Sequence, residues 1–466
     1  MHNKGAKGGI GLLTLFCLSI GTIIGVGWIT LLGTWLGAAG SIGAILAFAL
    51  GGAIILPIVF CYGEALSITG ATGGEIAFAR AAGGRRAAMC AGWILLLIFL
   101  GVVAFEAISV AWIAGILFPA LLGPTLYSVL GADVHLGALL IGVGGTLIIA
   151  LFHLRGSQWI EKLQNFSTIT KLIAALIFIS AGLAFGDPAN LAPAFVRRDG
   201  AIELAGFFSV LSMTPLFYAG FNTTLQAVDE RDASVSLRGV GLVLVASILG
   251  AIVFYAGVIA SAAMSAPREL LLNADLPAAA AFDHAFSSSL MSKLVLISGL
   301  LGLVSAWNAT FFAATRVLAV LAEDGMIGSW FGRRSAATGS YFNATIFCAV
   351  LASLGAICGR NAVGPIVATS ALGLVAMFAI AAGSAIRLRR LQPDAPRSFK
   401  IPGGVKTAWL ALALSLGLMV ISLGHAVAEA GGFPLELAVL TGWAILGVGV
   451  AARGAGEPAR ADEWST

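Results

Sequence analysis

Long apolar stretches follow one another along almost the whole chain, and only short polar segments separate them. A helix needs about 20 predominantly apolar residues to cross roughly 30 Å of hydrocarbon. The pattern leaves no stretch long enough for a separate soluble domain, so it predicts an all-α integral membrane protein. Twelve spans are expected, at residues 10–38, 41–65, 88–118, 134–153, 165–186, 203–229, 238–264, 292–322, 341–358, 362–387, 405–427 and 434–452.

The amino-acid composition supports this prediction. Apolar residues make up 59% of the 466 positions and charged residues only 10%, and the mean hydropathy is +1.00. Soluble globular chains average about 25% charged residues. The first apolar stretch is too long for a signal peptide and has no clean small-residue cleavage site, so we interpret it as the first span.

The Lys and Arg residues fall mostly on one side of the predicted membrane. If the N-terminus is cytoplasmic, 19 of the 26 lie at the inner side and only five at the outer side. The positive-inside rule then places both termini in the cytoplasm of a multi-pass protein in the cell membrane. No basic domain or basic-aromatic patch is present, so we expect the lipid bilayer and a small molecule as partners, and no nucleic acid. The sequence does not indicate an oligomeric state.

Residues suited to metal binding or enzyme catalysis are not grouped in the sequence. The five cysteines lie in or beside apolar stretches, with no CxxC pair and no histidine at metal-binding spacing, so we interpret them as packing residues. Neither an HExxH motif nor a GxSxG motif occurs within the spans. We therefore expect no enzyme activity, no cofactor and no metal.

The first predicted span contains the sequence GTIIGVG at residues 21–27. Each glycine costs about 1 kcal/mol relative to alanine in a helix interior, so three glycines in seven residues favour an interruption. Free N–H groups at an interrupted helix suit a carboxylate, and free C=O groups suit an ammonium. A small-residue seam for close helix packing explains the three glycines equally well.

The sixth predicted span contains Pro215, which lacks a backbone N–H, and Gly220, with several aromatic residues around them. This segment is either a second interruption facing the first or a single proline kink packed against neighbouring helices. At an interruption, aromatic rings would cover a ligand, and the Tyr218 hydroxyl and the Asn222 amide would read its polar end.

The two candidate interruptions are five spans apart, so their helices cross the membrane in opposite directions. This spacing predicts an inverted repeat. Residues 1–186 would form the first five-helix repeat, residues 187–390 the second, and residues 391–466 two accessory spans with a short cytoplasmic tail.

Several motifs, in order along the chain, resemble those of the amino acid-polyamine-organocation permeases. The residues that carry the resemblance are GTIIGVGW at 21–28, YGEA at 62–65, TGGE at 72–75, the aromatic-glycine segment at 217–230 and the stretch at 308–325 that contains Arg316. The resemblance implies alternating access and a substrate held between broken helices 1 and 6 of a fold with two inverted five-helix repeats.

The resemblance also implies roles for individual positions. The substrate carboxylate would meet backbone N–H groups of helix 1, its ammonium would meet carbonyls of helices 1 and 6, and an apolar side chain would close over it. The expected substrate-binding residues are Thr22, Ile23, Ile24, Gly25, Val26, Gly27, Leu216, Phe217, Tyr218, Ala219, Gly220 and Asn222.

Lys171 lies near one end of the fifth span, where a lysine either snorkels to the membrane surface or reaches inward to the first span. The sequence TKL at 170–172 resembles the fifth-helix lysine of sodium-independent permeases, whose ammonium takes the place of sodium in sodium-coupled relatives. The resemblance implies that Lys171 is a fixed cation or a proton-coupling site. Ser305 is its expected oxygen partner.

Glu106 lies near the middle of the third span and is expected to face protein or water and not lipid. It either takes part in coupling, by taking up a proton or by contacting a cationic substrate group, or it makes a structural hydrogen bond, for example to Ser109. Asp229, Glu230 and Arg316 are either ordinary interfacial charges or an inner gate closed by ion pairs.

The leading hypothesis is a secondary active transporter of amino acids that is proton-coupled or exchanges substrates and needs no sodium. An amine such as a polyamine or ethanolamine is an alternative substrate, with Glu106 binding its cation. A ligand sensor that binds without transporting is the alternative from another class. Asn222 and Glu323 depart from common family residues, which leaves the side-chain specificity of the pocket open.

Overall fold

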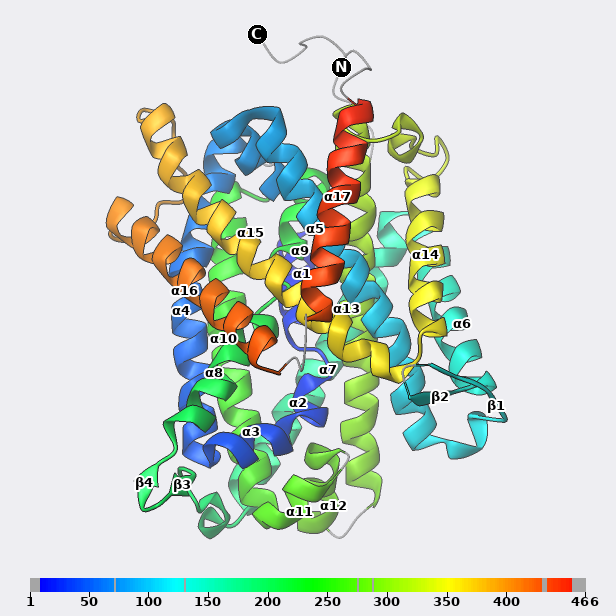
Figure 1. Ribbon diagram of the computed structural model, residues 1–466, viewed down its shortest axis with the longest axis vertical. Coiled ribbons are helices and arrows are strands. Elements are labelled where there is room, and N and C mark those ends of the chain that lie inside the picture. Colours follow the sequence, from blue (N-terminus) through cyan, green and yellow to red (C-terminus); the bar gives the residue numbers. More distant parts are fainter. Residues whose placement is uncertain are drawn as a thin grey trace.

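The structure, a computed structural model, describes residues 9–70, 73–129, 131–274, 276–286, 289–429 and 434–454. Long helices dominate these residues (Figure 1). Ten of the described helices are long and apolar enough to cross a membrane, and two shorter apolar helices, Leu204–Phe217 and Phe342–Ile357, lie where the sixth and ninth spans are predicted. The chain is therefore a multi-pass membrane protein. Both chain ends, which are predicted to be cytoplasmic, and Thr72 of the TGGE motif lie outside the described residues.

The helices from the first half of the chain are α1 (Leu12–Ile23), α2 (Gly27–Thr30), α3 (Leu32–Ala39), α4 (Ser41–Thr69), α5 (Glu75–Leu117), α6 (Leu136–Leu154) and α7 (Ser157–Phe185). Those that follow are α8 (Leu204–Phe217), α9 (Thr223–Ala227), α10 (Leu237–Ser265), α11 (Arg268–Asn273), α12 (Pro277–Phe286), α13 (Ser289–Glu323), α14 (Phe342–Ile357), α15 (Val363–Leu391), α16 (Val405–Glu429) and α17 (Leu435–Gly454).

Small elements join these helices. Strand β1 (Thr125–Val129) pairs antiparallel with β2 (Ala132–His135), and β3 (Arg197–Arg198) pairs antiparallel with β4 (Ala201–Ile202). The β3–β4 hairpin lies near α11 and α12 at the lower end of Figure 1, and the β1–β2 hairpin lies at its right edge below α6. The short 3-10 segments are η1 (Pro119–Leu121), η2 (Pro188–Leu191), η3 (Val228–Glu230), η4 (Ser329–Gly332) and η5 (Arg360–Ala362).

The predicted first span is made of three helices. Helix α1 ends at Ile23, α2 begins at Gly27, and α3 continues from Leu32. The predicted sixth span is likewise divided, because α8 ends at Phe217 and α9 begins at Thr223. The chain therefore leaves the helical conformation at both segments that the glycine and proline pattern indicates.

Helix α5 begins at Glu75, well before the predicted third span at residues 88–118. Its first part precedes a kink at Gly84, whose φ of 76° is unfavourable for residues with a side chain. Hydropathy did not reveal this part because Arg80, Arg85 and Arg86 lower the apolar character of the segment. The kinked part brings Glu75 back toward the interior, where it is buried.

Helix α1 lies in the middle of the bundle, where it contacts α7, α9, α10 and α13. Around it, α5 packs against α13 and α15, and α4 packs against α10 (Figure 1). Helix α17 packs on α5 and α15 and leaves most of its surface exposed. The two divided helices therefore meet inside the bundle, away from its lipid-facing rim.

Candidate functional site

The glycine-rich segment between α1 and α2 interrupts the backbone hydrogen bonding of the first span. Ile24, which follows α1, has φ −87° and ψ 79°, outside the helical region. Because α2 starts anew at Gly27, its first backbone N–H groups have no partner within the helix. The segment thus leaves carbonyl oxygens at the end of α1 and N–H groups at the start of α2 available to other partners.

The interruption between α8 and α9 lies directly against the first one. Gly220 has a φ of 115°, a conformation that favours glycine. A Cβ atom at this position would meet the side chain of Thr22 and would lie 3.0 Å from the backbone nitrogen of Ile23. Gly220 is therefore needed both for the turn and for the close approach of the two segments.

The three glycines of the first segment have different surroundings. A Cβ atom at Gly21 would overlap side-chain atoms of Gln164 and Thr168, and one at Gly27 would overlap the ring of Phe217. Nothing lies within 4 Å of a Cβ atom at Gly25. Close packing therefore accounts for Gly21 and Gly27, whereas Gly25 faces open space.

Lys171 reaches inward from α7 to the first interruption. Its Nζ donates hydrogen bonds to the carbonyl oxygens of Gly21 at 2.5 Å and Ile24 at 2.6 Å, and to Ser305 Oγ at 2.6 Å. The side chain is 1% exposed, so it does not snorkel to the membrane surface. Ser305 belongs to α13, so Lys171 of α7 contacts both α13 and the carbonyl end of α1.

A cavity of about 690 Å³ lies between the two interruptions. Its lining runs from Gly25 and Asn222 at the interruptions to Trp112 near the end of α5 and Arg360 in η5. Arg360 at that end stacks over the Trp112 ring, 4.2 Å from its centroid. The predicted substrate-binding residues that line the cavity are Thr22, Ile23, Gly25, Val26, Gly27, Leu216, Phe217, Ala219, Gly220 and Asn222.

Two of the predicted substrate-binding residues are not in the cavity wall. The carbonyl of Ile24 is engaged by Lys171. The Tyr218 hydroxyl donates to the carbonyl oxygen of Phe48 at 2.8 Å, and the side chain is buried between α8 and α4. In this conformation Asn222, and not Tyr218, presents a polar side chain to the cavity.

Glu106 of α5 also lines the cavity. Its side chain is 3% exposed, and its Oε2 atom has no hydrogen-bond partner among the described residues. Glu106 and Lys171 are close enough to interact electrostatically. A buried carboxylate with an unpartnered oxygen at a cavity wall can accept a hydrogen bond or a proton from a ligand or from water.

Of the three charged residues predicted to form an inner gate, Glu230 and Arg316 form an ion pair, whereas Asp229 has a different partner. Arg316 donates from Nε to Glu230 Oε1 at 2.8 Å, and its guanidinium lies 4.0 Å from the centroid of the Phe312 ring. Asp229 instead accepts a hydrogen bond from the backbone nitrogen of Gly73 at 3.2 Å. The pair of Glu230 and Arg316 therefore joins η3 to α13, and Asp229 joins η3 to the start of α5.

Tyr255 of α10 belongs to the site, but sequence reasoning did not identify it. Its hydroxyl lies 2.9 Å from the carbonyl oxygen of Ile23 and 3.2 Å from that of Phe217, so it bridges the two interruptions. Its ring stacks on Phe48 with a centroid distance of 4.7 Å. Nothing in the apolar sequence of the seventh span distinguishes this tyrosine from a packing residue.

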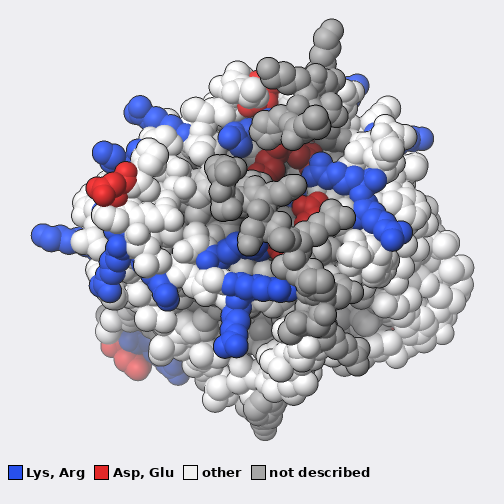
Figure 2. Space-filling view, turned by 90° about the horizontal axis from the view of Figure 1, so that it is seen from above, with Lys and Arg blue, Asp and Glu red and all other residues white. Residues whose placement is uncertain are grey.

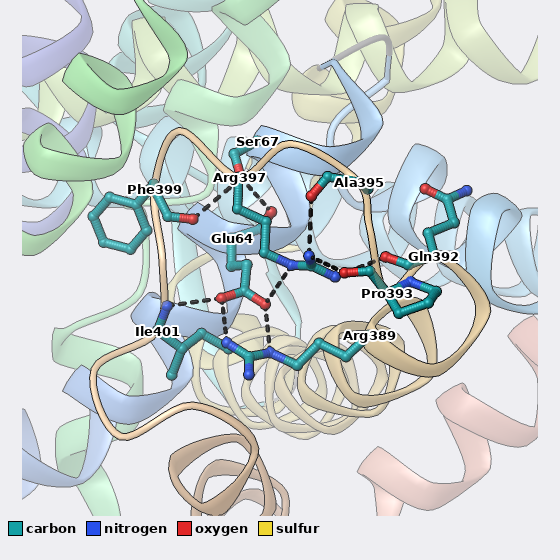
Figure 3. A network of polar contacts seen from close by, with 9 residues as sticks. All are labelled: Glu64, Ser67, Arg389, Gln392, Pro393, Ala395, Arg397, Phe399 and Ile401. Atoms are coloured by element: carbon teal, nitrogen blue, oxygen red, sulfur yellow. Dashed lines mark hydrogen bonds and ion pairs between the residues drawn. The ribbon is translucent and has the colours of Figure 1, made fainter.

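A second polar network, which the sequence also did not reveal, surrounds Glu64 of α4 (Figure 3). Its fully buried carboxylate accepts from Arg389 Nε at 2.5 Å and Nη2 at 2.6 Å, and from the backbone nitrogen of Ile401 at 2.8 Å. Arg397 Nε lies 3.5 Å from the same carboxylate. The network fastens α15 and the segment before α16 to the end of α4.

A multi-pass helical bundle in which two interrupted helices face one inner cavity has the architecture of a membrane transporter. The family model for amino acid permeases matches residues 10–446. The chain belongs to the amino acid permease family.

Curated relatives agree with this assignment. The chain is 25% identical to the branched-chain amino acid permease BcaP of Bacillus subtilis over 90% of its own length and 89% of the relative. It is 22% identical to a methylthioribose transporter of the same organism, over 83% and 82% of the two lengths. It is 27% identical to the inner membrane transport protein YbaT of Escherichia coli, over 68% and 70%. These comparisons identify an amino acid transporter and not an enzyme.

Proposed function

We propose that this amino acid permease is a secondary active transporter that carries a small amino acid by alternating access, without sodium, and either with a proton or in exchange for a second substrate. The observation that carries the proposal is the Lys171 ammonium, which is hydrogen-bonded to the carbonyls of Gly21 and Ile24 and to Ser305. A fixed cation at this point satisfies the carbonyls of the broken helix, so the site needs no sodium ion there.

The backbone on both sides of the cavity suits a zwitterion. We propose that the substrate carboxylate binds N–H groups of the segment 24–27 and that its ammonium binds carbonyls of Thr22 and Ala219. In this conformation the N–H groups of Ile24 and Gly25 donate to the carbonyls of Ile20 and Ile23, so those of Val26 and Gly27 are the ones offered to the carboxylate. The Tyr255 hydroxyl already lies within hydrogen-bond distance of the carbonyls of Ile23 and Phe217, and its single O–H donates to one of them at a time. Leu216 or Phe217 would close over the substrate from α8.

The proposed architecture has twelve spans in two inverted repeats, residues 1–186 and 187–390, followed by two accessory spans within residues 391–466. Contact between the two interrupted segments at Gly220 and Thr22 supports this pairing of repeats. Figure 2 shows many Lys and Arg side chains on the face at the upper end of Figure 1. This distribution supports placing that face in the cytoplasm, with the protein in the cell membrane.

A second candidate substrate is an amine without a carboxylate, such as a polyamine or ethanolamine. The unpartnered Oε2 atom of Glu106 at the cavity wall favours it, because a buried carboxylate is stabilised by a cationic ligand. A panel of amino acids and amines in a thermal-shift assay separates the two candidates. Stabilisation by amines alone would favour the second candidate.

Purified protein in liposomes tests the proposed function directly. Labelled amino acid should enter with a proton gradient or with counter-substrate inside, and replacing sodium by choline should leave the rate unchanged. Empty liposomes are the control. Strong ligand binding with no uptake in either format would contradict transport and support a sensor, and a strict need for sodium would contradict the role given to Lys171.

A further inference from the structure

A group of buried polar side chains lies beyond the cavity, toward the predicted inner gate. Glu75, the first residue of α5, is fully buried, and its Oε2 atom accepts a hydrogen bond from Gln226 Nε2 at 2.6 Å. The side-chain amide of Asn222 faces the same carboxylate, although its nitrogen completes no hydrogen bond. Tyr62 of α4 is close enough to interact with it electrostatically. Because Asn222 also lines the cavity, the group borders the proposed substrate site.

Several buried polar atoms in this group have no hydrogen-bond partner among the described residues. Tyr62 Oη, Glu75 Oε1, Asn222 Nδ2 and Gln226 Oε1 have no partner among the described residues, and the four side chains are at most 4% exposed. An unpartnered buried polar atom costs about 1–3 kcal/mol, and an ionised carboxylate costs more. No Lys or Arg in the described part of the chain forms an ion pair with Glu75. A proton on Glu75 would remove its charge and would also supply a donor to an unpartnered acceptor.

The segment that carries Glu75 is attached to the inner half of the divided sixth span. The backbone nitrogen of Gly73 donates to Asp229, and a Cβ atom at Gly74 would lie 2.8 Å from Gln226 Nε2. The next residue of η3, Glu230, is paired with Arg316 of α13. A movement of α9 and η3 that opens this end would therefore disturb the partners of Glu75 and admit water to it.

We propose that Glu75 carries the coupling proton of this transporter, as a site separate from Lys171 and Glu106. Glu75 would take a proton from water in the cavity beside Asn222. When α9 moves, its carboxylic O–H bond would break, the electron pair would stay on the carboxylate and the proton would pass to water at the opposite end. Tyr62 from α4 is the titratable group that interacts with Glu75 electrostatically, and Asn222 and Gln226 are its polar neighbours. The charged groups attached to the same segment are Asp229, which accepts from Gly73, and the pair of Glu230 and Arg316 that follows it. The proposal rests on the proposed transport function.

The variant Glu75→Gln tests the proposal, because an amide is neutral at every pH and keeps the size of the side chain. Proteoliposomes with Glu75→Gln should retain substrate counterflow within about twofold of wild type, but uptake driven by a proton gradient should be lost. The uptake rate should also lose its change between about pH 5 and about pH 8, the range in which a buried carboxyl group can titrate. Glu269→Gln, at an exposed position of α11, is the matched control and should behave as wild type.

The conservative variant Glu75→Asp should restore the pH dependence, which a merely structural role would not require. Retention of proton-driven uptake and of the pH profile by Glu75→Gln would overturn the proposal. So would a wild-type transporter whose rate does not depend on pH.

Infrared spectroscopy gives a readout that does not need transport. Wild-type protein in lipid should show a protonated carboxyl band that decreases as the pH rises, and Glu75→Gln should remove one component of it, whereas Glu269→Gln should not. Glu106→Gln identifies the contribution of the buried carboxylate at the cavity wall. A band that Glu75→Gln leaves unchanged would contradict the proton site. A different combination of results separates the two proposals. If Glu75→Gln loses the carboxyl band but the wild-type protein transports no amino acid, the proposed transport function is contradicted, whereas Glu75 is still a proton-binding site.

Discussion

At the scale of single residues, the ammonium of Lys171 replaces hydrogen bonds that helix α1 loses where it ends. It donates to two carbonyls of the broken segment and to one hydroxyl of α13, so one side chain from α7 holds three elements together. Such charge-assisted hydrogen bonds are worth about 1.5–3 kcal/mol each. Removal of the charge should therefore affect the whole site and not only one contact.

Lys171→Met should lower the initial rate of amino acid uptake at least about tenfold, because about 1.4 kcal/mol already corresponds to that factor. Methionine keeps most of the volume of the side chain but leaves the carbonyls of Gly21 and Ile24 without a donor. Lys162→Met, at an exposed position on the same helix, is the matched control and should keep the wild-type rate. The rate is measured in proteoliposomes at matched protein content, and wild-type uptake by Lys171→Met would contradict the role of the ammonium.

The placement of Lys171, Ser305 and Gly220 at the interruptions could be predicted from the sequence, because a charge, a hydroxyl or a glycine is conspicuous inside an apolar span. Their roles in transport stay predictions. The position of Tyr255 could not be predicted in this way. Its hydroxyl reaches the carbonyls of two separate helices only because the folded structure brings these helices together. Glu75 is part of the TGGE motif, but its burial follows from the kink at Gly84, which hydropathy does not indicate.

At the scale of elements, glycine positions and charged side chains decide where helices stop and how their ends are fixed. Apolar length alone predicted where the long helices lie, and helix-breaking residues predicted the two interruptions. The contacts between elements could not be predicted in the same way. Glu64 and Arg389 are 325 residues apart in the chain, and the polar segment before α16 gave no indication that it folds back onto α4.

Glu64→Gln should lower the free energy of unfolding by about 3–5 kcal/mol, because it leaves the charges of Arg389 and Arg397 without their buried partner. Glu203→Gln is the matched control. It removes the exposed pair with Arg198, whose charged atoms are 3.8 Å apart, and should cost less than about 1 kcal/mol. Thermal or denaturant unfolding in the same detergent measures both variants. Equal destabilisation by the two variants would show that the Glu64 network does not stabilise the fold in this way.

At the scale of the whole molecule, the cavity and the charged gate lie toward opposite ends of the bundle. The cavity lining includes Arg360 of η5, between α14 and α15, whereas Glu230 and Arg316 pair at η3, which follows α9. With the Lys-rich and Arg-rich face of Figure 2 placed in the cytoplasm, the cavity is directed toward the outside. In this proposed orientation, the structure would correspond to the conformation that receives substrate from outside.

Labelling of cysteines in intact cells tests this orientation. Cys358, which is exposed between α14 and η5, should react with a membrane-impermeant maleimide from outside when the other exposed cysteine is removed by Cys90→Ser. Ala337→Cys, in the exposed segment between η4 and α14, should react only after the membrane is permeabilised when both Cys90 and Cys358 are replaced by serine. The two positions lie at opposite ends of α14, so they should be on opposite sides of the membrane if α14 forms the predicted ninth span. The reverse pattern of labelling would invert the orientation and direct the cavity toward the cytoplasm.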